Sequence, residues 1–206
     1  TIFDRVVTLT PEALTPWLPS YALRTDGIAV ITFYQYLTNN QIAAKVHAHV
    51  RQAQSANARA VILDVRGSSG GSAFESLASA GAFMDTVGVR FESSGASVFE
   101  SGAITGTGFK IADPAKWSGP VIVLTNQISR SAAEYMAYFL QRAGRARVLG
   151  EPTAGVLNTS TTVSPLPDGG AVLKVTMLPD NEYVLGSCST PAILTVILAL
   201  AVGANG

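Results

Sequence analysis

Residues 60–71 read AVILDVRGSSGG, and this stretch decides the fold class. It opens with a short, continuous apolar run, which is typical of a strand buried on both faces of a parallel sheet. It ends in a glycine-rich loop, and glycine allows the backbone to turn sharply where such a strand ends. A buried strand followed by a turn of this kind predicts an α/β domain.

The segments on either side repeat this alternation of strand and helix. Further strands are predicted at residues 28–33, 120–125 and 147–150. Helices are predicted at residues 38–56, with Thr38 as N-cap, and at 73–85 and 131–143. Short strands and a loop are predicted at 89–110, and a hairpin turn at 167–170 that leads into 171–177. Together these elements predict a largely parallel sheet with flanking helices.

Size and composition indicate one well-buried domain. The chain has 206 residues, of which 48% are hydrophobic and only 14% are charged, so apolar material suffices for one core. Pro11, Pro16 and Pro19 predict an irregular lead-in over residues 1–26, and residues 27–206 are predicted to form the core.

Charge and cysteine content exclude several partners and sites. The chain has 14 basic and 14 acidic residues and no basic run. It therefore lacks the clustered positive charge with which proteins bind nucleic acid. Cys188 is the only cysteine, which excludes an internal disulfide and a cysteine zinc site, and we expect neither metal nor cofactor. Residues 191–204 are apolar but shorter than the about 20 residues of a membrane span, and predict a closing core helix. No signal peptide is visible after Thr1.

Active sites of parallel α/β sheets lie beyond the carboxyl ends of the strands, and two such ends carry unusual residues here. The loop at 64–71 offers N–H groups that could hold an oxyanion or a phosphate. A plain strand-to-helix turn is the commoner reason for such glycines. The loop lacks the Gly-Lys-Ser/Thr ending of a nucleotide-binding P-loop.

Ser131 stands where a helix is predicted to begin, directly after the strand at 120–125. The free N–H groups and the positive end of a helix dipole favour the negative charge that develops in acyl transfer. Ser131 and Glu134 also fit a capping box, and a cap alone is the commoner reason for serine at this position. The residues by themselves leave both interpretations open.

Four segments in this order resemble the C-terminal processing (tail-specific) serine peptidases. Residues 64–71 match that family's Asp-Leu-Arg-Gly-Asn-x-Gly-Gly loop, and 119–124 match its Gly-Pro-Val-x-Val-Leu strand. Residues 129–134 match its nucleophile motif Ser/Thr-Ala-Ser-Ala-Ala/Ser-Glu, with Arg130 at the first alanine. Residues 150–155 match its Gly-Glu-x-Thr-x-Gly motif.

The resemblance covers roughly residues 27–177 and implies a crotonase-like fold, also described as similar to the Clp protease core. It implies a serine-type endopeptidase that hydrolyses extended or C-terminal polypeptide segments. It also implies roles for six residues: Ser131 as nucleophile, Gly70, Gly71 and Ala132 as an oxyanion hole, and Ser129 and Glu134 as supporting residues.

One position departs from the family. A lysine that acts as general base directly follows Gly-Glu-x-Thr-x-Gly in the processing peptidases, whereas this chain has Val156. The chain is therefore closer to the tricorn-like and retinoid-binding-protein-like branch that lacks this lysine. A solvated surface position is the plainer interpretation of each lysine present, namely Lys45, Lys110, Lys116 and Lys174.

The tricorn-like branch uses a Ser-His-Glu triad, but this chain offers weak counterparts. His47 and His49 stand two residues apart in the predicted helix at 38–56, where surface positions are the plainer interpretation. Glu182 is a weak counterpart of the acidic residue of that branch. No PDZ segment is visible. Three explanations stay open: the chain has lost its His-bearing N-terminal part, its base comes from another subunit or chain, or the site is inactive.

Two other functions stay open. The first is a catalytically inactive binding module of the same fold for a peptide or an apolar ligand, as in the retinoid-binding branch. The second, weaker one is acyl-CoA chemistry, because crotonases share the fold type. The resemblance implies a polypeptide as partner, a homo-oligomer or a missing N-terminal PDZ part, and a periplasmic or secreted location, with a cytoplasmic one for the tricorn-like minority.

Overall fold

The structure is a computed structural model, which describes residues 17–37, 41–91 and 95–156. It also describes the backbone of three later strands, β9 (Ser160–Pro165), β10 (Val172–Met177) and β11 (Glu182–Leu185). Side chains are described for residues 17–37, 41–88 and 97–156.

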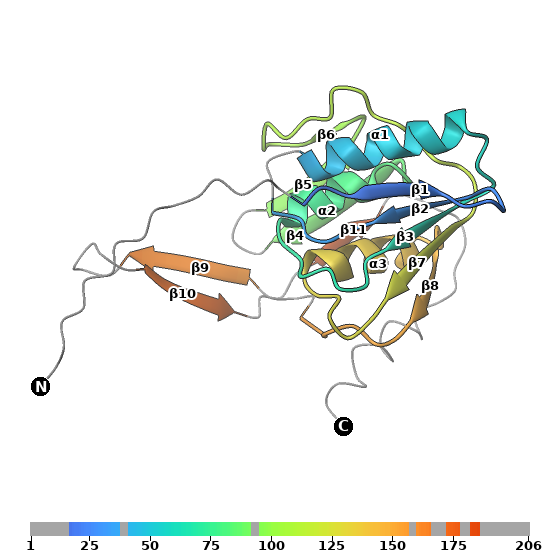
Figure 1. Ribbon diagram of the computed structural model, residues 1–206. Helices are drawn as coiled ribbons and strands as arrows, with labels where there is room; N and C mark the ends of the chain where they lie inside the picture. Colours follow the sequence, from blue (N-terminus) through green and yellow to red (C-terminus); the bar gives the residue numbers. More distant parts are fainter. Residues whose placement is uncertain are drawn as a thin grey trace, which may run out of the picture.

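A five-stranded sheet forms the centre of the molecule (Figure 1). In spatial order its strands are β1 (Ser20–Leu23), β2 (Ile28–Thr32), β3 (Ala60–Asp64), β7 (Val121–Thr125) and β8 (Arg147–Gly150). Strands β2, β3, β7 and β8 are parallel, and only the edge strand β1 is antiparallel to its neighbour. The predicted α/β class with a largely parallel sheet is therefore confirmed.

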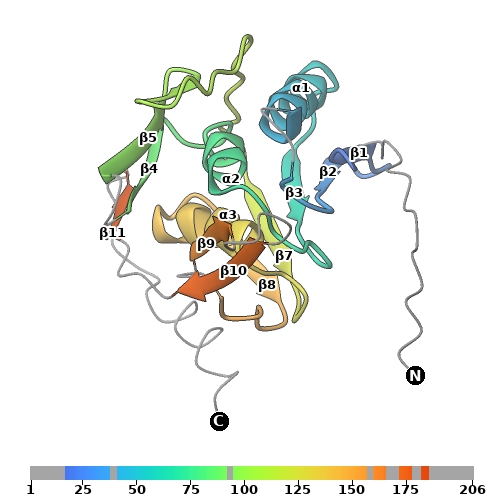
Figure 2. The ribbon, with the colours of Figure 1, turned by 90° about the vertical axis from the view of Figure 1, so that its left-hand side faces the viewer.

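Three helices follow the strands and pack on the sheet. They are α1 (Gln41–Ser55), α2 (Ala73–Ala80) and α3 (Ala132–Arg142). Figure 2 shows all three on one face of the five-stranded sheet. Alternate residues of β2, β3 and β7 are buried on that face, which is why their sequences need apolar residues at every second position.

A second, antiparallel sheet lies on the far side of the helices (Figure 2). It consists of β11, β4 (Thr86–Phe91), β5 (Gly95–Glu100) and β6 (Ala103–Ile104). Helix α2 contacts β4, β5 and β6, so it is covered from both sides. Strands β9 and β10 form the predicted hairpin, with Pro165 opposite Val172, and its turn lies outside the described residues.

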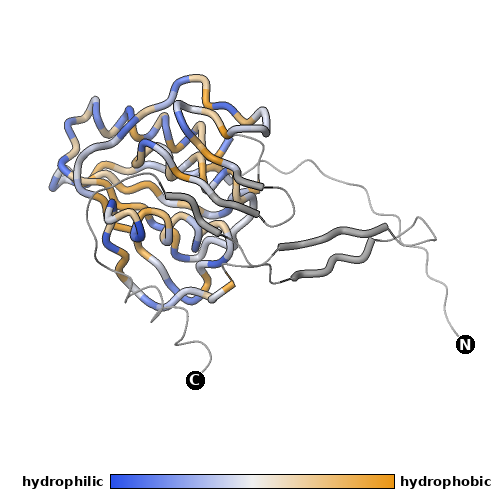
Figure 3. Tube along the Cα trace, turned by 180° about the vertical axis from the view of Figure 1, so that it is seen from behind, coloured by the Kyte–Doolittle hydropathy of each residue, from blue (hydrophilic) through white to orange (hydrophobic). Residues whose placement is uncertain are grey.

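Between these layers lies one apolar core. Its largest fully buried side chains are Phe33, Tyr36, Ile31, Ile42, Leu63, Leu77, Phe83, Met136, Phe139 and Leu140. Figure 3 shows hydrophobic residues concentrated in the central strands and helices, and hydrophilic residues in the peripheral turns. The described residues thus pack around one apolar core.

The expectation of surface histidines is wrong. His47 is fully buried and His49 is 7% exposed, because α1 is packed on more than one side. His47 Nε2 lies 3.0 Å from the carbonyl oxygen of Ala78 on α2, and His47 Nδ1 accepts from the N–H of Ala115 at 2.9 Å. His49 Nε2 lies 2.9 Å from the carbonyl oxygen of Pro19. Both rings therefore join α1 to neighbouring segments.

Other boundaries also differ from expectation. The segment expected to be irregular contains strand β1, which pairs with β2 because the turn at Asp26-Gly27 reverses the chain. Helix α2 ends at Ala80 rather than Asp85, and a side chain at Gly81 would meet the ring of Phe99. The predicted N-cap Thr38 and the predicted helix at 191–204 lie outside the described residues.

Candidate active site

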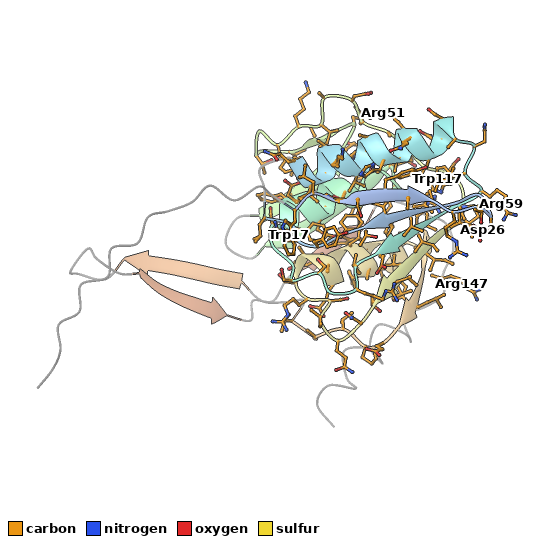
Figure 4. The ribbon with its side chains drawn as sticks, in the orientation of Figure 1. Trp17, Asp26, Arg51, Arg59, Trp117 and Arg147 are labelled. Carbon is orange, nitrogen blue, oxygen red and sulfur yellow. The ribbon has the colours of Figure 1, made fainter. Side chains whose placement is uncertain are left out.

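The four parallel strands end along one edge of the main sheet, which we call the carboxyl edge. Their register places Thr32 beside Asp64, Asp64 beside Leu124, and Thr125 beside Gly150. The loops that follow these strands therefore lie next to one another: 33–37, 65–72, 126–131 and 151–156. Figure 4 shows the opposite edge on its right, where Arg59 and Arg147 precede or begin strands.

Ser131 is the N-cap of α3 and has an unusual backbone conformation. Its φ is 52° and its ψ is −115°, a combination that non-glycine residues rarely adopt. Such strain costs on the order of 1–3 kcal/mol and persists only where the surroundings enforce it. Here a sharp turn between β7 and α3 presents the half-buried Ser131 side chain at the carboxyl edge.

Gly70 packs directly against Ser131. Its φ is 83°, and a Cβ at this position would come within 2.8 Å of Ser131 Cβ and 2.6 Å of the carbonyl oxygen of Arg130. Gly71 has a φ of 141°, and a Cβ there would come within 2.5 Å of the carbonyl of Tyr36. Both glycines are therefore required by close backbone approach, and the loop at 64–71 is more than a plain turn.

Gly70 packs against Ser131 and Ala132, and Gly71 follows in the same loop. Within the described part of the chain, the N–H groups of Gly70, Gly71 and Ala132 donate no hydrogen bond. Tyr36 instead holds the loop at 70–72 by two other hydrogen bonds. Its N–H donates to the Gly70 carbonyl at 2.8 Å, and its carbonyl accepts from the N–H of Ser72 at 2.6 Å. These three N–H groups can therefore receive an anionic oxygen without breaking an existing hydrogen bond.

Ser129 and Asn126 hold the two loops together. The Ser129 hydroxyl is fully buried and donates to the carbonyl oxygen of Val65 at 2.8 Å. Asn126 Oδ1 accepts from the N–H of Gly67 at 3.0 Å and from that of Ile128 at 3.1 Å. Sequence reasoning assigned no role to Asn126, although asparagine directly after a strand is a known signal for such a turn.

Glu134 ties the start of α3 to the segment after β8. Its carboxylate, on a residue only 5% exposed, accepts from Ser131 N at 2.7 Å, which forms one half of a capping box. It also accepts from Thr153 Oγ1 and Gly155 N, each at 2.7 Å, and from Val156 N at 3.1 Å. The cap is thus real, and the same carboxylate also organises the site. Sequence reasoning assigned no role to Thr153.

A buried acid and a buried phenol lie behind this loop. Glu75 of α2 is fully buried and accepts from the N–H of Ala43 at 2.8 Å, so it caps the start of α1. Tyr36 is also fully buried, and burial raises its pKa well above the usual value, with a smaller contribution from the charge of Glu75. Neither side chain is hydrogen-bonded to the Ser131 hydroxyl.

The described residues provide no evident general base for Ser131. No described histidine, lysine, aspartate or glutamate side chain forms a hydrogen bond with its hydroxyl oxygen. Lys45, Lys110 and Lys116 are exposed, as predicted, and Lys116 pairs with Asp85. The Lys174 side chain lies outside the described residues. Among described residues, no group of three or more metal-ligating side chains gathers at one place.

The family model of peptidase family S41 matches residues 27–182. The carboxyl-terminal-processing protease of Picosynechococcus sp. is 29% identical over 141 residues, which cover 66% of this chain and 32% of that protein. The chain therefore spans about a third of the length of this relative.

Solved structures share the fold at low identity. A photosystem II D1 C-terminal processing protease has a TM-score of 0.56 and 20% identity, covering 77% of this chain and 38% of that one. A lipoprotein of Streptococcus agalactiae has a TM-score of 0.57 and 18% identity, with 79% and 64% covered. A putative protease of the same family from Bacteroides fragilis has a TM-score of 0.55 and 16% identity, with 81% and 45% covered. The predicted Clp protease-like, crotonase-like fold is confirmed.

Proposed function

Because this chain belongs to peptidase family S41, we propose that it is the core of a serine-type endopeptidase in which Ser131 is the nucleophile. The proposed substrates are extended or C-terminal segments of polypeptides, in line with the name of the processing protease that it resembles. Among the described residues, no helix is long and apolar enough to cross a membrane.

One observation carries the proposal, namely the backbone of Ser131. Its φ of 52° and ψ of −115° project the hydroxyl from a sharp strand-to-helix turn, which is the geometry that serine hydrolases use to expose a nucleophile. A serine that acts only as a helix cap needs no such conformation, because ordinary N-caps have extended backbone dihedrals. The N-cap Ser72 of α2, with φ of −70° and ψ of 124°, is such an ordinary case.

The proposed chemistry is acyl transfer. The Ser131 oxygen bonds to the scissile carbonyl carbon while its proton passes to a base, and the carbonyl oxygen becomes an oxyanion. The available N–H groups of Gly70, Gly71 and Ala132 are the proposed oxyanion hole. The C–N bond then breaks as the leaving amine takes a proton, and water hydrolyses the resulting ester to release the acid and restore the serine.

The general base is proposed to come from outside the described residues or from another chain. A serine hydroxyl needs a base to become a nucleophile, and the described side chains supply none in contact with Ser131. The resemblance also supports a proposed export to the periplasm or the exterior, and immunoblots of periplasmic, culture and cytoplasmic fractions of the source cells would test this.

The proposed nucleophile is tested by labelling the intact protein with a fluorophosphonate probe, read by mass spectrometry. We expect one label at Ser131 that disappears in Ser131→Ala. Ser101→Ala is the matched control, because Ser101 is exposed and also has a positive φ, of 50°. A folded protein that takes no label would contradict an active peptidase formed by this chain alone and leave a fragment that awaits its partner or a binding module. A label that survives in Ser131→Ala would contradict Ser131 as the nucleophile.

A further inference from the structure

An open aromatic pocket lies at the end of the main sheet and has no role in the proposed chemistry. Trp17, Leu18 and Tyr34 line it, and its volume is about 370 Å³. The rings of Trp17 and Tyr34 meet edge to face with centroids 6.0 Å apart, and Ser20 Oγ lies 3.2 Å from the Tyr34 hydroxyl. No charged side chain is among the described residues that line it.

The topology places this pocket at the carboxyl edge. Strand β1 runs antiparallel to β2, with Ser20 opposite Thr32, so the residues before Ser20 lie beyond the carboxyl end of β2. Figure 4 shows Trp17 at the end of the sheet opposite to Arg59 and Arg147. Trp17 and Ser131 therefore lie on the same edge of the sheet.

The pocket is also connected to the proposed oxyanion loop through the backbone. The Tyr34 carbonyl accepts from the N–H of Ser69 at 3.3 Å, and two residues further on Tyr36 is hydrogen-bonded to both Gly70 and Ser72. The segment that carries the Tyr34 ring is thus paired with the segment that carries the proposed oxyanion donors. A polypeptide held at Ser131 would pass close to this pocket on the Gly70 side.

Exposed apolar side chains are unevenly distributed and gather at this edge. Trp17 is 69% exposed, Tyr34 41%, Leu37 67% and Ile128 53%, and each follows or lies beyond the end of a parallel strand. Single exposed apolar residues are ordinary, but several around one candidate site indicate a binding surface. Leu23, which is 45% exposed, lies at the opposite edge.

We propose that the pocket of Trp17, Leu18 and Tyr34 is a specificity subsite that binds an apolar side chain of the extended polypeptide substrate. This inference rests on the proposed function for the identity of its occupant. An aromatic, uncharged lining favours aliphatic and aromatic side chains and disfavours carboxylates, which would lose hydration without gaining a partner. The subsite would select where the chain is cleaved, whereas Ser131 would perform the cleavage.

Tryptophan fluorescence can report occupancy of the pocket directly. The chain has two tryptophans, of which Trp17 is 69% exposed and Trp117 only 6% exposed. Ser131→Ala protein is titrated with short Gly/Ser peptides that carry one central Leu, Phe or Asp. We expect a blue shift with the Leu and Phe peptides and none with the Asp peptide, because only an apolar side chain displaces water from Trp17.

Variants then separate the pocket from the rest of the surface. Fluorescence anisotropy of labelled Leu and Phe peptides is measured on Ser131→Ala protein that also carries Trp17→Ala or Tyr34→Ala. Either change should weaken binding by about tenfold or more, as is usual for aromatic anchors. Leu23→Ala is the matched control, because it removes an exposed apolar side chain from the opposite edge and should leave binding unchanged.

Fluorophosphonate labelling of the same variants with Ser131 retained distinguishes the two proposals. Labelling of Ser131 together with peptide binding that ignores Trp17 and Tyr34 would overturn the subsite and leave the proposed nucleophile standing. Selective binding without labelling would support the subsite and contradict the nucleophile. Self-association that Trp17→Ala abolishes would also overturn the proposal, because the pocket would then hold a second copy of the chain.

Discussion

Ser131 has a strained backbone, and its side chain fits only because the neighbouring Gly70 has no side chain. Ser131 has a φ of 52°, and its Cβ occupies space that a Cβ on Gly70 would need, with only 2.8 Å between them. The hydrogen bond from Ser131 N to Glu134 Oε2, at 2.7 Å, holds the strained turn. The geometry of the candidate nucleophile therefore depends on a neighbour 61 positions earlier in the sequence, which no local pattern around Ser131 reveals.

Gly70→Ala should abolish the reactivity of Ser131 and lower the free energy of unfolding by about 2–4 kcal/mol, because backbone strain and steric overlap add. Gly67→Ala is a matched control: Gly67 also has a φ of 77°, but a Cβ there would meet nothing within 4 Å. It should cost about 1–2 kcal/mol and keep the labelling. Urea unfolding and fluorophosphonate labelling check both variants, and equal effects would contradict the steric argument.

Val156→Lys should raise the rate at which fluorophosphonate labels Ser131. The backbone nitrogens of Ser131 and Val156 both donate to Glu134 Oε2, at 2.7 Å and 3.1 Å, so the two residues lie close together. A lysine at this position, where the resemblance implies the family's base, would supply a proton acceptor. General bases contribute about 10²-fold or more.

Val156→Met tests whether charge or bulk is responsible for the expected gain. Methionine is also long and unbranched but cannot accept the proton, so the labelling rate should stay at the level of the unchanged protein. A rate that rises equally with Met and Lys, or with neither, would show that position 156 does not place a base on Ser131.

At the scale of elements, Glu134 joins α3 to the segment after β8. One carboxylate accepts four hydrogen bonds, from Ser131, Thr153, Gly155 and Val156. Glu134→Gln replaces one acceptor oxygen with an NH₂ group that faces N–H donors. We expect a loss of about 1–3 kcal/mol in unfolding free energy and a marked fall in Ser131 labelling, because the turn at α3 loosens.

Glu151→Gln is the matched control for this prediction. Glu151 belongs to the same segment after β8, but its side chain is exposed. Among the described residues it is held through its backbone alone: its N–H donates to the Thr125 carbonyl at 3.1 Å, and its carbonyl accepts from Thr125 Oγ1 at 2.9 Å. This variant should match the unchanged protein in stability and labelling, and a comparable loss in both variants would contradict a special role for Glu134.

At the scale of the whole molecule, His47 joins three parts of the fold. Its ring lies on α1, contacts the Ala78 carbonyl of α2, and accepts from Ala115 in the segment that leads to β7. Burial lowers the pKa of His47, an effect only partly offset by the carbonyls of Ala78 and Ala115. A second proton on this ring would face the N–H of Ala115, so the neutral ring is the one that fits.

Stability should consequently fall on acidification. The unfolded chain binds a proton on His47 at about pH 6.5, whereas the folded pKa is lower, so the unfolded state binds more protons in between. The contribution of His47 is complete above about pH 6.5 and declines as the pH falls toward its folded pKa, by at most about 1.4 kcal/mol per pH unit. Urea unfolding from pH 8 to 5 checks this, and His47→Gln should remove that part of the slope.

The sequence by itself determined the class of fold, and its motifs, through the family resemblance, pointed to the residues of the candidate site. Continuous apolar runs such as Ala60 to Val65 can be satisfied only as buried parallel strands, and parallel strands bring their following loops to one edge. The family resemblance implied that Gly70, Gly71, Ser131 and Glu134 belong to one site, and the structure brings Gly70, Ser131 and Glu134 together. Local pattern sufficed for the fold class because the type of each element and the chemistry of its turns are encoded within each segment.

Only the tertiary structure decided what depends on contacts between distant segments. His47 and His49, for which surface positions were the plainer interpretation, are buried because α1 is covered on several sides. Part of the expected irregular lead-in forms strand β1, which pairs with β2. This pairing places Trp17 at the carboxyl edge, in contact with Tyr34. The physical reason is that burial, backbone strain and shared hydrogen-bond acceptors arise when segments pack together, and no single segment contains that information.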